Sequence, residues 1–253
     1  LCVANRIVEG KQQTVLWHVD DCLASHVNTA INDELMEYLR GKYEDKEIGL
    51  LKATRGKIHE FLGITIDFSV KGQVSFDMSR HVADIIKTCE DIGIDVSEMA
   101  KTPAATHLFT VNADAEKLDE TKQQQLHNVT AKGLFVSKRV RIDIQLVIGF
   151  LTTRVKGPDE DDWKKMLRMV CYLNWTKHLR RTIRVTDGYI QWYINAAHTV
   201  HDDLRGHTGG IMTLGKGAVI AKLIKQKLNT RSSTESEIVG IDDLMPDILW
   251  TNR

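Results

Sequence analysis

The first quarter of the chain alternates short β-rich runs with one helical pattern. Residues 14–19 are β-rich, Asp20 and Asp21 follow at once, and residues 22–24 are again apolar. This order predicts two strands joined by a tight hairpin that carries two carboxylates at its tip. From residue 28 to residue 43 the apolar positions recur at helical spacing, which predicts an amphipathic helix.

The middle of the chain changes from strand-like to helical patterns. Residues 58–68 and 74–76 are predicted as paired strands, and Ser79 is the predicted N-cap of a helix over residues 80–91. A Lys-Thr-Pro sequence at 101–103 ends this region, and the stretch through residue 119 is polar and predicted to be irregular. Three more helices are predicted at residues 120–136, 143–154 and 163–176.

After Thr182 the hydrophobic period changes to two, which is typical of strands. Strands are predicted at residues 183–185, 190–194, 210–214 and 218–223, followed by a helix from Ser233. This change predicts a domain boundary near residue 185. A length of 253 residues also favours more than one domain, and the mixture of elements predicts an α+β fold.

Composition excludes several classes of protein. The hydrophobic content of 42% fits an ordinary globular protein, and no apolar run is long enough to span a membrane. The four cysteines have no paired spacing, which argues against a zinc site or a disulfide framework and favours a reducing compartment. The formal net charge is zero, but basic residues gather at 138–141, 177–184 and 222–231. Phosphate binding needs such local positive surface rather than a positive total.

Asp20 and Asp21 have two possible functions. Aspartate is common in turns because its side chain bonds nearby backbone groups. Alternatively, two adjacent carboxylates can bind Mg²⁺, a hard cation that also binds substrate phosphates.

Several motifs occur in an order that is similar to one family. Residues 17–21 (Trp-His-Val-Asp-Asp) resemble the Tyr-Val-Asp-Asp box of reverse transcriptases, and residues 60–64 resemble the primer-gripping Tyr-Leu-Gly segment. Residues 141–144 are similar to an Arg-Pro-Asp-Ile motif. The segments 101–103, 131–135 and 163–176 continue the likeness, and segments 192–197, 207–210, 225–227 and 232–237 resemble the start of a ribonuclease H. The chain therefore resembles the polyprotein of copia-type (Pseudoviridae) LTR retrotransposons.

The resemblance implies a fold and a division into three parts. Residues 1–105 would be the C-terminal part of the reverse transcriptase palm and thumb, a β-hairpin with helices. Residues 106–184 would be a helical thumb or connection region. Residues 185–253 would be the N-terminal part of a ribonuclease H-like α/β domain.

The resemblance also implies functions for individual residues. Asp20 and Asp21 would be catalytic metal ligands of the palm, and Glu237 would be a catalytic metal ligand of the ribonuclease. Phe61, Leu62 and Gly63 would form the primer grip. Asn195 stands where the family has the first ribonuclease aspartate, and a neutral amide cannot offset the charge of Mg²⁺.

The implied activity is RNA-directed DNA polymerisation with ribonuclease H, which requires Mg²⁺ or Mn²⁺. The implied partners are an RNA or DNA template–primer and deoxynucleotides, inside the cell in a cytoplasmic particle or the nucleus, without a membrane. A further palm aspartate would precede Leu1 and a further ribonuclease carboxylate would follow Arg253, so we expect weak metal binding and no activity in this chain alone. The departures His18, Ile142 and Asn195 leave an alternative, a degenerate remnant that acts at most as a nucleic-acid-binding module.

Overall fold

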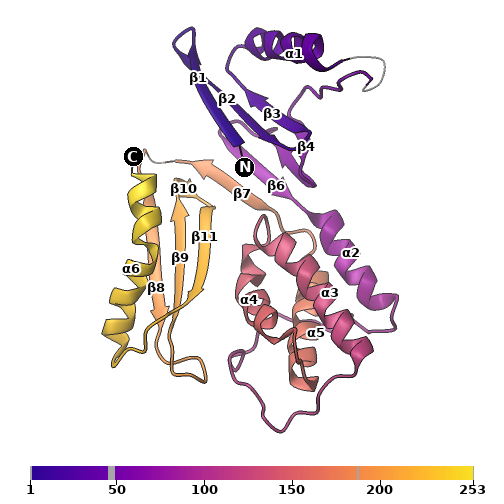
Figure 1. Ribbon diagram of the computed structural model, residues 1–253, viewed down its shortest axis with the longest axis vertical. Coiled ribbons are helices and arrows are strands. Elements are labelled where there is room, and N and C mark those ends of the chain that lie inside the picture. Colours follow the sequence, from indigo (N-terminus) through magenta and orange to yellow (C-terminus); the bar gives the residue numbers. More distant parts are fainter. Residues whose placement is uncertain (1, 45–48, 187, 253) are drawn as a thin grey trace. The chain divides into compact units, whose positions relative to one another are not determined.

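The computed structural model describes residues 2–44, 49–186 and 188–252 (Figure 1). The chain divides into two compact units, Leu1–Ser69 and Val70–Arg253. The boundaries expected at residues 105 and 185 both lie within the second unit, and the three-part division stays a prediction.

The described residues of the first unit form an antiparallel three-stranded sheet, one helix and one further hairpin. Its elements are β1 (Cys2–Val8), β2 (Lys11–His18), β3 (Asp21–Ser25), α1 (Thr29–Tyr43), β4 (Ile58–Phe61) and β5 (Ile64–Asp67). Strand β1 was not predicted from the sequence. Glu9 and Gly10, with φ of 51° and 71°, join β1 to β2 in the two-residue turn that matches strand twist.

Two contacts fix α1 in the first unit. Gln13 of β2 is buried, and its amide donates to the Ile31 carbonyl at 3.4 Å and to Asn32 at 3.0 Å. Ile31 is the buried residue of α1, and Asn28 caps the helix by accepting from the Ala30 N–H. The helix predicted at residues 28–43 is confirmed.

The helical part of the second unit follows one strand. Its elements are β6 (Gln73–Asp77), α2 (Ser79–Glu90), α3 (Glu120–Ser137), a 3₁₀ turn (Ile142–Ile144), α4 (Gln145–Arg154) and α5 (Glu160–Trp175). The prediction of Ser79 as N-cap is wrong by one residue: Met78 is the N-cap, and Asp77 accepts from the Ser79 N–H at 2.6 Å. The helix expected at 163–176 begins at Glu160, because Asp159 and Asp162 form a capping box.

The helices share one apolar core. Its largest fully buried apolar side chains come from α2, α3, the 3₁₀ turn, α4 and α5: Ile85, Leu126, Ile144, Ile148, Leu151, Met166, Met169 and Leu173. Gly133 of α3 faces Ile148, and a β-carbon there would lie 2.4 Å from the Ile148 side chain. The absence of a side chain at residue 133 therefore permits the close approach of α3 and α4.

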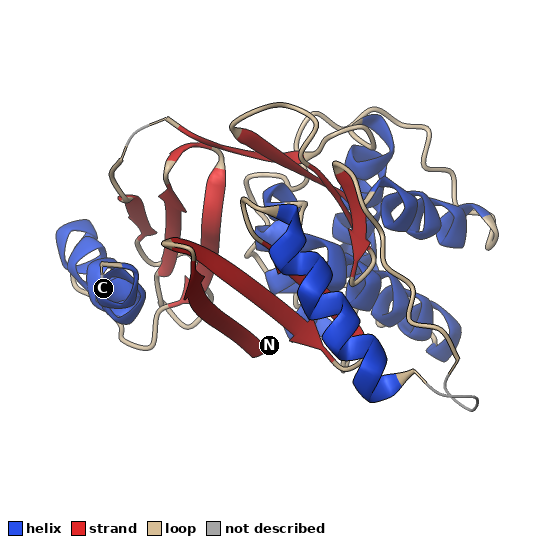
Figure 2. Ribbon diagram, turned by 90° about the horizontal axis from the view of Figure 1, so that it is seen from above, coloured by secondary structure: helices blue, strands red, loops and turns tan. Residues whose placement is uncertain are grey.

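The rest of the second unit includes a three-stranded sheet that a helix covers on one face (Figure 2). Its elements are β7 (Arg181–Val185), β8 (Gln191–Ala197), β9 (His207–Thr213), β10 (Gly215–Lys216), β11 (Ala218–Lys225) and α6 (Ser233–Thr251). The strand order is β11-β9-β8, all antiparallel, whereas β7 pairs with β6 and β10. Gly210 of β9 and Ala196 of β8 face Leu244 and Gly240 of α6. Among the described residues, no helix has the length and apolarity needed to cross a membrane.

Candidate functional site

The hairpin between β2 and β3 holds the predicted carboxylate pair. His18 is paired with Asp21, so the turn consists of Val19 and Asp20, and Asp21 is the first residue of β3. The predicted hairpin is therefore confirmed, with only Asp20 in the turn itself. Val19 has φ 54° and is 89% exposed. A β-branched residue is strained in this left-handed conformation, and such strain is concentrated at functional sites.

Both carboxylates of this hairpin are available to a ligand. Asp20 and Asp21 are exposed. Within the described ranges neither accepts a hydrogen bond or pairs with a cation. Two unengaged carboxylates at one tip are a donor set that fits Mg²⁺ or Mn²⁺, and water would complete the coordination.

The predicted primer-grip residues occupy the hairpin between β4 and β5, which corrects the single strand expected over residues 58–68. Phe61 ends β4, is buried and is paired with Ile64. Leu62 and Gly63, with φ of 51° and 73°, form the turn. This hairpin and the β2–β3 hairpin belong to the same unit, where β3 contacts β4.

Glu237 of α6 contacts the backbone of β8 one residue after Asn195. Glu237 Oε2 accepts a hydrogen bond from the Ala196 N–H at 3.1 Å, one peptide unit from Asn195. The Asn195 side chain is exposed and points to the face opposite α6, because its neighbour Ala196 faces that helix. One carboxylate and one amide supply a single negative charge, so this pair does not fit a Mg²⁺ site.

Beneath α6 lies a polar network that the sequence analysis did not identify. Gln226 is fully buried and donates to Thr208 at 3.1 Å and to the Ser236 carbonyl at 2.8 Å. Thr208 donates to Asp243 at 2.8 Å, and His198 Nδ1 lies 3.0 Å from the Ser236 hydroxyl. These bonds fix the N-terminal half of α6, and with it Glu237, against the sheet. Thr208, Gln226 and Ser236 lie in segments of the family resemblance, but nothing in the sequence predicts that they contact one another.

Residues 141–144, one segment of the family resemblance, belong to a buried network of hydrogen bonds. Arg141 is 2% exposed, forms a bidentate pair with Asp143 and donates to the carbonyl and hydroxyl oxygens of Thr176. Tyr172 donates to the same carboxylate at 2.8 Å. This motif joins the end of α5 to the segment between α3 and α4, so its function here is structural.

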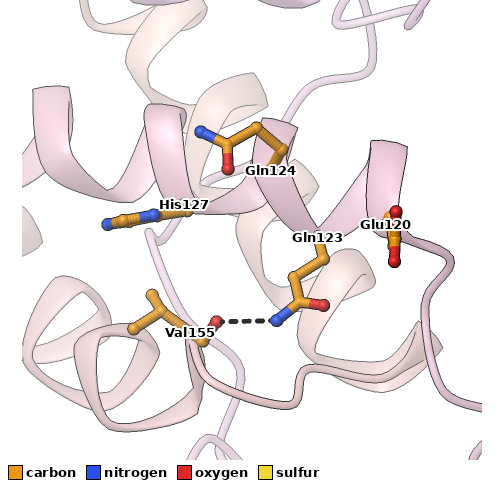
Figure 3. Close-up of a pocket in the computed structure, with 5 residues that line it drawn as sticks. All are labelled: Glu120, Gln123, Gln124, His127 and Val155. Atoms are coloured by element: carbon orange, nitrogen blue, oxygen red, sulfur yellow. Dashed lines mark hydrogen bonds between the residues drawn. The ribbon is translucent and has the colours of Figure 1, made fainter.

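An open pocket of about 400 Å³ lies along α3 (Figure 3). It is lined by Glu120, Gln123, Gln124, His127 and Val155. The Gln123 amide donates to the carbonyls of Val155 and Lys156 at 3.3 and 3.2 Å, which satisfies backbone groups after the end of α4. None of the predicted site residues lines this pocket.

Within the described part of the chain, no group of three or more His, Cys, Asp or Glu side chains could hold a metal ion.

Comparison with known proteins relates the chain to a retrotransposon protein. The chain is similar to a Saccharomyces cerevisiae protein whose name describes it as a transposon Ty5-1 protein. The two are 24% identical over 241 residues, covering 91% of this chain and 72% of the yeast protein. This similarity supports a retrotransposon-derived origin for the chain. No family model matches it, and no solved structure matches it significantly.

Proposed function

We propose that this chain is part of the reverse transcriptase and ribonuclease H region of a copia-type retrotransposon polyprotein. Its contribution to the polymerase would be the carboxylate pair Asp20 and Asp21. The observation that carries this proposal is the two-residue turn of Val19 and Asp20, which exposes both carboxylates without a competing cation. The similarity to a yeast transposon protein over most of the chain supports the same assignment.

The chemistry of the proposed site depends on a divalent metal. Bound Mg²⁺ would activate the primer 3′-hydroxyl and stabilise the leaving group in nucleotidyl transfer. Asp20 and Asp21 would hold the metal and offset its charge. Leu62 and Gly63, at the tip of the neighbouring hairpin, would help to position the primer end. Because two carboxylates alone bind Mg²⁺ weakly, we propose that this chain by itself does not extend primers.

The ribonuclease part is proposed to be impaired. Asn195 replaces an aspartate in the resemblance, and Glu237 uses one oxygen to bind the Ala196 amide. The remaining negative charge is too small to hold two Mg²⁺ ions.

A binding experiment tests the metal site. Mn²⁺ is titrated into the purified chain and free Mn²⁺ is followed by electron paramagnetic resonance, for the wild type, the double variant Asp20→Asn/Asp21→Asn, and the control Asp33→Asn/Asp114→Asn. We expect weak Mn²⁺ binding that the first double variant loses and the control keeps. Equal binding by all three proteins would contradict the proposal.

The same proteins are then given a primer–template, deoxynucleotides and Mg²⁺. We expect no extension by the folded wild type. Extension that Asp20→Asn/Asp21→Asn abolishes would support the site and disprove only the proposed inactivity.

A second candidate function is a non-catalytic remnant that binds nucleic acid. Asn195 is the observation that favours it, since the ribonuclease centre cannot assemble its usual charge. Binding of a primer–template without Mn²⁺ binding at Asp20 and Asp21 would favour this second candidate.

A further inference from the structure

A histidine and an aspartate face each other across the β2–β3 turn. His18 is the last residue of β2, Asp21 is the first residue of β3, and the two are register partners. Directly opposed residues of an antiparallel pair project from the same face of the sheet, with their β-carbons about 4.5–5.5 Å apart. At this spacing an imidazole nitrogen and a carboxylate oxygen can reach one ion.

The turn between the two strands fixes this pairing. Val19 and Asp20 form a two-residue connection, and Val19 has φ 54°. The length and type of such a turn set the register of a hairpin, so His18 is held on the same face as Asp21. Asp20 lies in the turn itself, so Asp21 is the carboxylate directly opposite the imidazole.

The neighbours of the pair differ between the two faces of the sheet. Leu16 and Leu23 form the next pair on the face of His18 and Asp21, and both are half-buried. Cys22 pairs with Trp17 and therefore projects to the opposite face. The thiol nearest to Asp21 in the sequence is thus not part of the pair.

Both side chains of the pair are open to a ligand. His18 and Asp21 are exposed. A cross-strand contact of opposite charges would be a structural reason for the two residues. However, in the described part of the chain neither side chain forms a hydrogen bond or an ion pair. The donor atoms of both residues are therefore not used by the fold.

We propose that His18 and Asp21 chelate a divalent transition-metal ion, for which Zn²⁺ is the reference. Imidazole suits Zn²⁺ and its neighbours among the transition metals, whereas Mg²⁺ takes oxygen ligands. The pair supplies one nitrogen and one oxygen ligand. Water would complete the tetrahedral coordination that Zn²⁺ prefers.

The chelation gives the hairpin a choice between two kinds of metal. Mg²⁺ would use the carboxylates of Asp20 and Asp21, whereas Zn²⁺ would use His18 with Asp21. The two ions then compete for Asp21, so His18 determines how strongly Zn²⁺ displaces the other metal. This competition rests on the proposed function, because it needs the carboxylate pair, but the chelation itself does not.

Nuclear magnetic resonance of the full chain, labelled with ¹⁵N at histidine, tests the chelation with ZnCl₂ as the probe. The ring signal of His18 is assigned by its absence in His18→Gln. We expect this signal to move as an equimolar amount of Zn²⁺ is added at neutral pH. The signal of His178, which is exposed and lies outside the strands, should stay in place.

Two variants test which groups complete the site. In Asp21→Asn the zinc concentration that moves the His18 signal should rise about tenfold or more, because the carboxylate ligand is lost. Cys22→Ser is the matched control, since its side chain projects to the opposite face, and it should behave as the wild type. The His26 ring lies 3.4 Å from the Val8 carbonyl oxygen, so an unchanged His26 signal shows that the first unit of each variant is folded.

Three results would overturn the inference. A His18 signal that does not move would show that no site exists. Equal movement in the wild type and in Asp21→Asn would show a lone imidazole without a partner. Loss of the movement in Cys22→Ser would show that the thiol is the ligand.

The Mn²⁺ titration of the carboxylate pair separates this result from failure of the proposed function. Mn²⁺ binding without a zinc-dependent His18 shift would overturn the chelation alone. A His18 shift in a chain that does not bind Mn²⁺ would support the chelation and contradict the proposed carboxylate pair. Where both ions bind, Zn²⁺ should release Mn²⁺ from the wild type at a lower concentration than from His18→Gln. Equal release from the two proteins would overturn the assignment of His18.

Discussion

Glu237 of α6 accepts a hydrogen bond from the backbone amide of Ala196, the residue after Asn195. Ala196 is the register partner of Thr208 in β9, and β8 is an edge strand of its sheet. A helix and a strand that are about forty residues apart in the sequence thus meet at this hydrogen bond.

The variant Asn195→Asp should bind a divalent cation no more tightly than the wild type. The side chain of residue 195 points to the face opposite α6, so a carboxylate there does not share one ion with Glu237. Calorimetric titration with Mn²⁺ measures the binding. The double variant Asn195→Asp/Glu237→Gln is the comparison, and it should bind as the single variant does. Tighter binding by Asn195→Asp that the double variant loses would show that the two carboxylates reach one ion.

The variant Val19→Gly should stabilise the β2–β3 hairpin. Val19 has φ 54° and is 89% exposed, so glycine relieves strain of about 1 kcal/mol and removes little packing. Urea unfolding monitored by circular dichroism measures the free energy. Val27→Gly is the matched control: Val27 is 77% exposed and its φ is not positive. The control should lose about 0.5 kcal/mol or more, since glycine gains entropy in the unfolded chain. Destabilisation by both variants would disprove strain at residue 19.

The variant Arg141→Met should destabilise the helical part of the second unit by about 3 kcal/mol. Methionine leaves Asp143 without its cation and Thr176 without its donor. Tyr172→Phe removes one hydrogen bond to the same carboxylate and should cost about 1 kcal/mol. Denaturant unfolding gives both values. Adding Asp143→Asn to Arg141→Met should recover part of the loss, and no recovery would mean that charge is not the cause.

Acid should weaken the second unit through His207. Burial, the positive charge of His201 and that of Lys225 lower the pKa of His207 to about 4. Its Nδ1 lies 3.1 Å from His201 Nε2, and both rings contact Phe109. The pKa of His201 is lowered too, mainly by burial and by Lys225, although Asp202 and Asp203 oppose this.

A histidine whose folded pKa is depressed takes up its proton more readily when unfolded. Its contribution to stability is complete above about 6.5 and is lost as the pH falls toward 4. Melting temperatures between pH 4 and pH 7 should therefore fall less in His207→Phe than in the wild type. The exposed His178→Gln serves as the control and should follow the wild type. Parallel curves for all three proteins would rule out His207 as the cause.

The local elements could be predicted where hydrophobic spacing or a turn-forming residue determines the backbone conformation. The hydrophobic spacing of residues 28–43 predicted α1, and the Asp20–Asp21 turn predicted the β2–β3 hairpin. The β1 strand was missed because its residues are almost all exposed, which leaves no apolar face to produce a pattern. The turn at Leu62–Gly63 was missed because leucine seldom adopts positive φ.

The sequence by itself determined the helices, most of the strands and the two exposed carboxylates, since these depend on side-chain period and turn chemistry. The tertiary structure decided which distant residues meet. It placed Glu237 on the Ala196 amide, joined the two basic clusters through Arg181, and buried Gln226 under α6. The physical reason is that buried polar groups must find hydrogen-bond partners, and those partners come from whichever segments the packing brings near.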